Sequence, residues 1–123
     1  STKDAPLRFD SNSTQAWKYR PKTAIDIDTK ILEGRWKNQG WFGTYYDLFF
    51  PWIYHVNLKW IHFNESETGS FWIWHEGLGW IWSRAENFPY CFSHMSNDWI
   101  YLDFEKPGSG KYYDFINRSW ENL

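Results

Sequence analysis

The sequence lacks several features that would assign it to a familiar class of protein. It contains a single cysteine, Cys91, so no disulfide can form within the chain. There are 13 Lys and Arg against 15 Asp and Glu, and no basic block is present, so nucleic acid is not an expected partner. No run of about 18 apolar residues is present to span a membrane. Residues 1–10 show no signal-peptide pattern and resemble the start of a mature chain or of a piece cut from a longer one.

Aromatic residues, in contrast, are abundant. Trp 11, Tyr 8 and Phe 10 together make up 24% of the 123 residues. Each aromatic side chain can bury roughly 150–250 Å², so a short chain with this composition can still build a substantial core. Tyr and Trp also keep a polar group at one end of the ring, which suits surfaces that remain partly hydrated.

A repeat of about 20 residues runs through most of the chain. Each of the three middle units, residues 51–63, 71–82 and 89–102, has an aromatic run, a short polar or Gly-bearing link, and a second run that begins with Trp. This pattern is typical of a β-hairpin. The unit at residues 111–120 is a weaker copy, and the unit around Trp41, whose first strand would have to include Arg35-Trp36-Lys37, is weaker still. The tryptophans that mark the five units are spaced by 19, 20, 19 and 21 residues: Trp41, Trp60, Trp80, Trp99 and Trp120.

We therefore predict an all-β fold in which tandem antiparallel β-hairpins of about 20 residues form a twisted sheet or a solenoid over residues 34–123. Turns are expected near residues 57–59, 76–79, 96–98 and 117–119, and turn-rich links near 64–69, 84–87 and 107–110. Residues 1–33 are more polar and are expected to form an N-terminal segment that is partly linker, with an edge strand at 23–28. The acids of that segment lack the Gly and the further oxygen ligands of a calcium loop, so no metal or cofactor is expected.

Strand alternation divides the predicted hairpins into two chemically different faces. In motifs such as Trp72-Ile73-Trp74 the tryptophans share one face and the isoleucine lies on the other. Either the rings stack along the repeat axis as a covered ladder, or part of the aromatic face stays open as a binding platform. The aliphatic face is expected to comprise Ile53, Ile61, Ile73, Ile81, Cys91, Ile100 and Leu102.

The platform alternative supplies the candidate ligand-binding residues. Flat aromatic rings suit the C–H faces of sugars, and neighbouring polar groups suit sugar hydroxyls. No pair of carboxylates is selected by its spacing for glycosidase chemistry, so no catalytic residues are assigned. The candidate ligand-binding residues are Trp52, Tyr54, Trp72, Trp74, Trp80, Trp82, Trp99 and Tyr101.

Three histidines, His55, His75 and His94, each lie five residues before a unit tryptophan. Imidazole is a common metal ligand, and equivalent positions could bring the three together. However, strand spacing separates successive repeats by roughly 5–10 Å, which favours hydrogen bonding within each turn over a shared metal ion. Cys91 lies in an apolar run and is expected to be a buried small hydrophobe.

The units resemble the choline-binding and glucan-binding repeats of bacterial surface proteins, through Leu78-Gly79-Trp80-Ile81-Trp82 and Gly40-Trp41-Phe42. They are also similar to the Leu-Gly-Trp repeats of large secreted bacterial proteins, through Pro51-Trp52-Ile53-Tyr54-His55 and Gly77-Leu78-Gly79-Trp80. The resemblance covers about residues 34–120 and implies tandem hairpins on a secreted or surface-displayed protein.

The function expected from the sequence is that of a non-catalytic carbohydrate-binding or surface-attachment module of a larger secreted protein, with a polysaccharide or cell-surface glycan as partner. The alternative is a structural or assembly module whose aromatic residues stack internally or against a second chain, which would include self-association. An enzyme ranks third among these interpretations.

Overall fold

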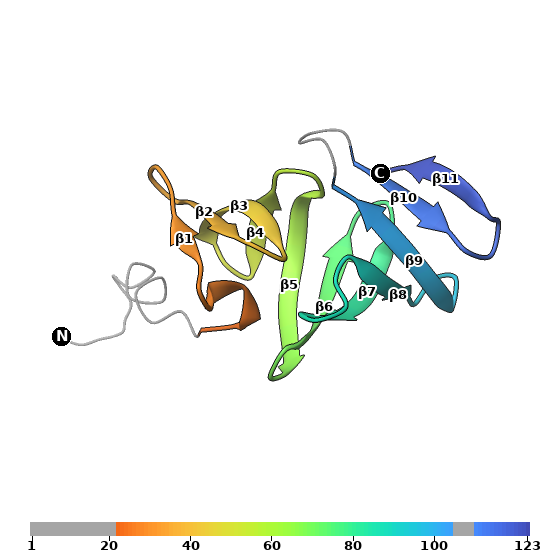
Figure 1. The fold of residues 1–123 in the computed structure, drawn as a ribbon, viewed down its shortest axis with the longest axis horizontal. Helices are drawn as coiled ribbons and strands as arrows, with labels where there is room; N and C mark the ends of the chain where they lie inside the picture. The colour runs from red at the N-terminus through yellow and green to blue at the C-terminus, as the bar shows by residue number, and fades with distance from the viewer. Residues whose placement is uncertain (1–21, 105–109) are drawn as a thin grey trace.

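The computed structural model describes residues 22–104 and 110–123, which form one antiparallel sheet of eleven strands (Figure 1). Each strand pairs with the next along the chain, and the sheet is not closed into a barrel. The prediction of an all-β fold of successive hairpins is therefore confirmed. The strands are β1 (Lys30–Ile31), β2 (Trp36–Gln39), β3 (Gly43–Phe49), β4 (Trp52–His55), β5 (Lys59–Glu67), β6 (Ser70–His75), β7 (Gly79–Arg84), β8 (Tyr90–Ser93), β9 (Asp98–Asp103), β10 (Lys111–Asp114) and β11 (Ser119–Asn122).

The hairpin loops lie within one to three residues of the predicted turns. They comprise residues 56–58, 76–78, 94–97 and 115–118, with a further loop at 40–42. The backbone is left-handed at Lys59 (φ 69°) and Gly79 (φ 70°), directly after two three-residue loops, and at Asn97 and Arg118, the last residues of the four-residue loops. A residue of this conformation closes a hairpin without splaying its strands. The expectations for residues 1–21 and 107–109 lie outside the described residues.

The inner face of the sheet forms the hydrophobic core. The aliphatic side chains that alternation assigned to one face are all buried, each at most 2% exposed, which confirms that assignment. Phe63 and Phe71 pack among them with ring centroids 5.0 Å apart and nearly parallel planes. The buried aliphatic set is Ile53, Ile61, Ile73, Ile81, Cys91, Ile100 and Leu102.

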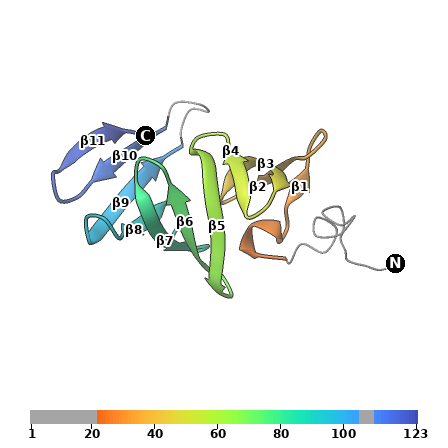
Figure 2. The ribbon, with the colours of Figure 1, turned by 180° about the vertical axis from the view of Figure 1, so that it is seen from behind.

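The sheet coils so that the end of β9 and the start of β10 lie against the β4–β5 hairpin. The rings of His55 and Phe104 are 4.9 Å apart. Gly110 lies so close to this hairpin that a Cβ there would stand 2.8 Å from the carbonyl oxygen of Asn57, and 2.4 Å from Leu123. Coiling gives the inner face a core with strands on several sides, as the two opposite views indicate (Figures 1 and 2). The opposite, outer face of the coiled sheet points toward solvent along the successive hairpins.

The segment before β1 is a short 3₁₀ helix, Ala24–Asp26, where the sequence predicted an edge strand. The edge strand prediction for 23–28 is wrong because Asp26 turns back to bond Thr23, accepting from its backbone N–H at 2.7 Å and its hydroxyl at 3.0 Å. This reciprocal cap stabilises a helical turn. The turn places Ile25 in the core with no exposed surface. The edge strand forms later, at β1.

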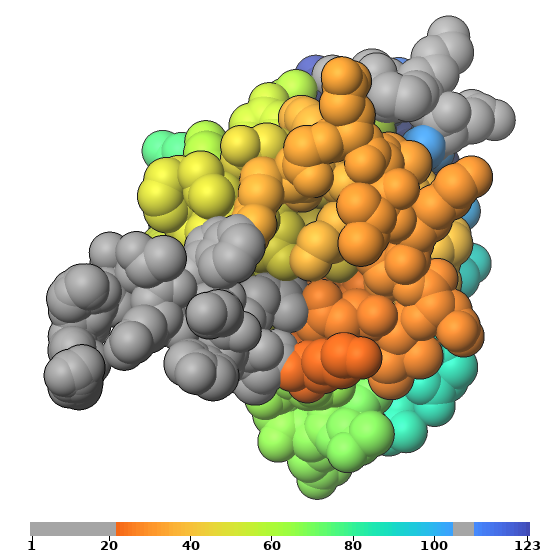
Figure 3. Space-filling model, turned by 90° about the vertical axis from the view of Figure 1, so that its left-hand side faces the viewer, coloured from red at the N-terminus to blue at the C-terminus, as the bar shows by residue number. Residues whose placement is uncertain are grey.

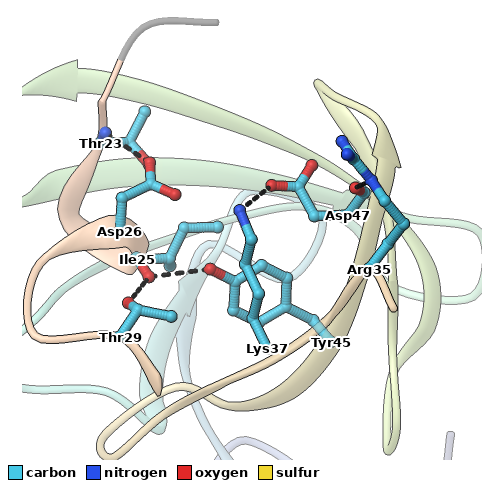
Figure 4. A network of polar contacts seen from close by, with 8 residues as sticks. All are labelled: Thr23, Ile25, Asp26, Thr29, Arg35, Lys37, Tyr45 and Asp47. Carbon is cyan, nitrogen blue, oxygen red and sulfur yellow. Dashed lines mark hydrogen bonds and ion pairs between the residues drawn. The ribbon is translucent and has the colours of Figure 1, made fainter. Parts of the chain in front are cut away.

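Polar contacts fix this segment to β2 and β3 (Figure 4). The Tyr45 hydroxyl donates to the carbonyl oxygen of Ile25 at 2.9 Å, and the Thr29 hydroxyl donates to the same oxygen. Beside them the Lys37 ammonium donates to the buried carboxylate of Asp47 at 2.9 Å. The first described residues spread over this end of the molecule (Figure 3). The segment thus covers one end of the core.

Trp41 does not occupy the position of the other unit tryptophans. The other four, Trp60, Trp80, Trp99 and Trp120, are each the second residue of a strand. Trp41 lies instead in the β2–β3 loop and stacks on Phe71 of the core, with ring centroids 5.6 Å apart. The equivalent position in β3 is taken by Thr44. Trp41 therefore fits the regular spacing of the unit tryptophans in the sequence, but it does not lie at the start of a strand as the others do.

Candidate functional site

The eight candidate ligand-binding residues all lie on the outer face of the sheet. The strands alternate between buried inner positions and partly exposed outer ones, so each candidate points away from the core. Trp52, Trp80 and Trp99 are 42%, 38% and 37% exposed. The side chains of Tyr54, Trp72, Trp74, Trp82 and Tyr101 are half-buried.

Strand register places these rings in rows that cross the sheet. In one central row Trp52 of β4 pairs with His62 of β5, which pairs with Trp74 of β6, which pairs with Trp80 of β7. The ring centroid of Trp52 lies 5.1 Å from that of the neighbouring His62 and 6.0 Å from that of Trp74, the next ring along the row. Interplanar angles of 86° and 78° show edge-to-face contacts, which stabilise aromatic pairs more than face-to-face sandwiches.

A second central row is built in the same way. Trp72 pairs with Trp82, Trp82 with Phe92, and Phe92 with Trp99, while Asn64 occupies the position next to Trp72 on β5. The rings of Phe92 and Trp99 are 5.7 Å apart at 78°. Neither central row includes a Lys, Arg, Asp or Glu. The face that these rows form is therefore aromatic, partly exposed and without formal charge along its centre.

Two flanking rows complete the aromatic face, and they contain residues that sequence reasoning did not assign to the site. Tyr54 and Tyr101 were predicted and each lies in one of these rows. Trp60 of a flanking row was missed, as were His62 and Phe92 of the central rows, although the alternation that selected Trp52 and Trp72 applies to them equally. The flanking rows are Trp36, Tyr46, Tyr54 and Trp60 on one side and Tyr90, Tyr101, Tyr113 and Trp120 on the other.

Among the hollows formed by the described residues, three that lie along the repeats each have a unit tryptophan in the wall. The hollow at Trp80 measures about 350 Å³ and the hollow at Trp99 about 480 Å³. The hollow at Trp120 measures about 440 Å³. The polar lining differs, since Glu86 lines the second and Asp103 the third. Only the lining of the first hollow, Asn64, Trp72, Trp80 and His94, has no carboxylate among these three.

His55 and His75 bond within their own hairpins, as the sequence favoured. The Nδ1 atom of His55 accepts from the backbone N–H groups of Asn57 at 3.0 Å and Leu58 at 3.2 Å. His75 accepts from Gly77 and Leu78 at the same two distances. With Nδ1 as acceptor, Nε2 of His55 donates to the carbonyl oxygen of Phe42 at 2.7 Å. Burial lowers the pKa of His55 to about 4 and lowers that of His75 as well.

His94 is not equivalent to these two histidines. The β8–β9 loop has one more residue, so Ser93 occupies the turn-bonding position, and its hydroxyl accepts from the N–H of Ser96 at 3.2 Å. His94 is exposed and lies against Trp72 on the outer face, with ring centroids 6.5 Å apart. The three histidines therefore do not converge. Within residues 22–104 and 110–123 no group of three His, Cys, Asp or Glu is placed to hold a metal ion.

The remaining reactive side chain, Cys91, is fully buried, and burial raises the pKa of its thiol well above the ordinary range. It belongs to the core, as expected for a small hydrophobe.

In the described part of the chain no helix is long and apolar enough to cross a membrane.

Comparisons of the chain with protein families, curated proteins and solved structures return no match.

Proposed function

We propose that the chain is a non-catalytic carbohydrate-binding or surface-attachment module of a larger secreted or surface-displayed protein. The observation that supports this most directly is the pair of central rows, in which aromatic rings lie side by side on the outer face and remain partly exposed. A contiguous exposed apolar surface of this kind usually marks an interaction site. The resemblance of the hairpin units to surface-protein repeats supports the same role.

The chemistry of the rows favours a sugar polymer over a compact ligand. Rigid rings bury area at little cost in side-chain entropy, and their faces match the C–H faces of sugar rings. Asn64 of the second central row and the tyrosines of the flanking rows are the polar groups that we expect to bond sugar hydroxyls, whereas the Nδ1 atom of His62 is buried. Binding is favoured over hydrolysis because neither central row supplies the two carboxylates that a glycosidase requires.

The proposal is tested by affinity electrophoresis of the whole chain through gels that contain a neutral polysaccharide: hydroxyethylcellulose, dextran or galactomannan. At least one of these should retard the chain. Trp74→Ala should weaken that binding by about 1–2 kcal/mol, roughly 5- to 30-fold, because one ring of the row is lost. Phe115→Ala is the matched control, since Phe115 is exposed in the β10–β11 loop and its ring contacts Tyr113 of a flanking row, away from the two central rows.

Failure of all three polymers would contradict the proposal. In that event sedimentation of the chain over a range of concentrations tests the assembly alternative. Self-association that Trp74→Ala abolishes and Phe115→Ala leaves unchanged would show that the aromatic face binds a second copy of the chain.

A further inference from the structure

The hollow at Trp80 is lined by side chains from three consecutive strands and one loop. Asn64 comes from β5, Trp72 from β6, Trp80 from β7 and His94 from the β8–β9 loop. These elements belong to three successive hairpins, which Figure 1 shows side by side in the middle of the molecule. The hollow of about 350 Å³ is large enough for one sugar ring and is open to solvent on the outer face.

Its aromatic walls meet nearly at right angles. Trp72 lies at 83° to Trp80 with centroids 6.4 Å apart, and at 79° to His94 with centroids 6.5 Å apart. A sugar ring that stacks on one of these faces presents its edge, where the hydroxyls are, to the neighbouring groups. The arrangement therefore fixes how a stacked ring is oriented, which a flat platform does not.

Two polar side chains stand at this edge with unused hydrogen-bonding capacity. Asn64 and His94 are both exposed, and among the described residues neither side chain makes a hydrogen bond to the protein. An amide offers two donors and an acceptor, and a neutral imidazole offers one of each, which matches the donor and acceptor character of a hydroxyl group. The ring of His94 packs edge-to-face against Trp72, but this contact uses none of its hydrogen-bonding capacity.

We infer that the Trp80 hollow is the specificity-determining subsite for one ring of an uncharged glycan, with Asn64 and His94 bonding its hydroxyls. The inference rests on the proposed function and narrows the ligand to a chemical class. The hollow has no Lys or Arg to pair with a carboxylate or sulfate on the sugar. A carboxylate or sulfate could accept hydrogen bonds from Asn64 and His94 but would find no cationic side chain in the lining, so an uncharged ring is favoured over an acidic one.

The hollow at Trp99 provides a matched site for comparison. It also has an aromatic wall and an asparagine, Asn87, but Glu86 adds a carboxylate to its lining. Asn87, like Asn64, is exposed, so replacing either by Ala removes one amide without opening the core.

The test measures binding of the whole chain by affinity electrophoresis at pH 8. The probes are hydroxyethylcellulose and dextran, each compared with its carboxymethyl derivative. At least one neutral polymer should bind at least 10-fold more tightly than its carboxymethyl form. Asn64→Ala and His94→Ala should each weaken that binding about 3- to 10-fold, as expected for the loss of one hydrogen bond. Asn87→Ala should change it less than 2-fold.

Four results would overturn the inference. Equal binding of a neutral polymer and its carboxymethyl form would remove the charge argument. Unchanged binding by both Asn64→Ala and His94→Ala, with Trp74→Ala still weakened, would leave the proposed function standing and place the specificity elsewhere. Displacement of a bound polymer by millimolar tetramethylammonium would show that the hollow takes a cation instead. If neither neutral polymer binds the unaltered chain, the inference fails together with the cellulose and dextran part of the proposed function.

Discussion

The two faces of the same strands show how one backbone serves two purposes. On β6, Phe71 and Ile73 point inward and have no exposed surface, while Trp72 and Trp74 point outward and are half-buried by their neighbours in the rows. Inner residues gain free energy from full burial and close packing. Outer residues gain less, from edge-to-face contacts across the strands. The comparison teaches that aromatic content alone does not identify the core of this protein.

The largest expected effect separates neighbouring residues on β6. Phe71→Ala should lower the free energy of unfolding by about 3–5 kcal/mol, because it opens a cavity among packed rings. Trp72→Ala should lower it by only about 1 kcal/mol, because what it loses is mainly cross-strand contact. Urea unfolding of both variants checks this. Equal losses would show that the two faces contribute alike to stability.

The pH dependence of stability tests the burial of a polar side chain on the inner face, the imidazole of His55. Burial holds the pKa of His55 at about 4, below its ordinary value of 6.5, so the unfolded chain takes up the proton first. Stability should therefore fall as the pH drops below about 6.5 and the fall should level off near pH 4. A shift from 6.5 to about 4 corresponds to roughly 3 kcal/mol.

The control for this experiment is His55→Gln, which keeps an acceptor near the turn but does not titrate. Urea unfolding at intervals between pH 7.5 and 4 should give a flatter profile for the variant than for the parent chain. Parallel profiles would mean that other groups account for the whole acid sensitivity.

The sequence was sufficient to predict the hairpins and both faces of the sheet because alternation and turn residues are local signals. The prediction at residues 23–28 failed because the same alternation also fits a capped helical turn that buries Ile25, and only tertiary packing decides between them. For the hollow at Trp80, the sequence predicted Trp72 and Trp80 as binding residues. It did not predict Asn64 and His94, because their positions in the lining depend on strand register and on the length of the β8–β9 loop.

The hairpin loops share a local sequence pattern that would have predicted the position of Trp41 in the first unit correctly. Residues 39, 55 and 75 each accept a backbone N–H from their own loop, and the third loop residue, Phe42, Leu58 or Leu78, is buried. A left-handed residue follows. Aligning on this pattern instead of on tryptophan places Trp41 inside a loop, where the structure has it.

The smallest expected effect concerns that left-handed position. Lys59 and Gly79 are equivalent, with φ near 70° in both, but only glycine adopts this conformation without a steric cost. Gly79→Lys should lower the free energy of unfolding by about 1 kcal/mol, and Lys59→Gly should raise it by about 0.5 kcal/mol. Thermal melts of both variants measure the difference. Shifts of the same sign would contradict the equivalence of the two loops.

The most direct test of the account compares two consecutive residues of β7 that face opposite ways, Trp80 and Ile81. Each Ala variant is titrated with a neutral polymer that retards the parent chain and is unfolded in urea. We expect Ile81→Ala to lose about 2–5 kcal/mol of stability while the folded protein binds within 2-fold of the parent. Trp80→Ala should bind at least about 5-fold more weakly and lose about 1 kcal/mol of stability or less. If both variants lose stability alike and neither loses binding selectively, the division into a structural inner face and a binding outer face is wrong.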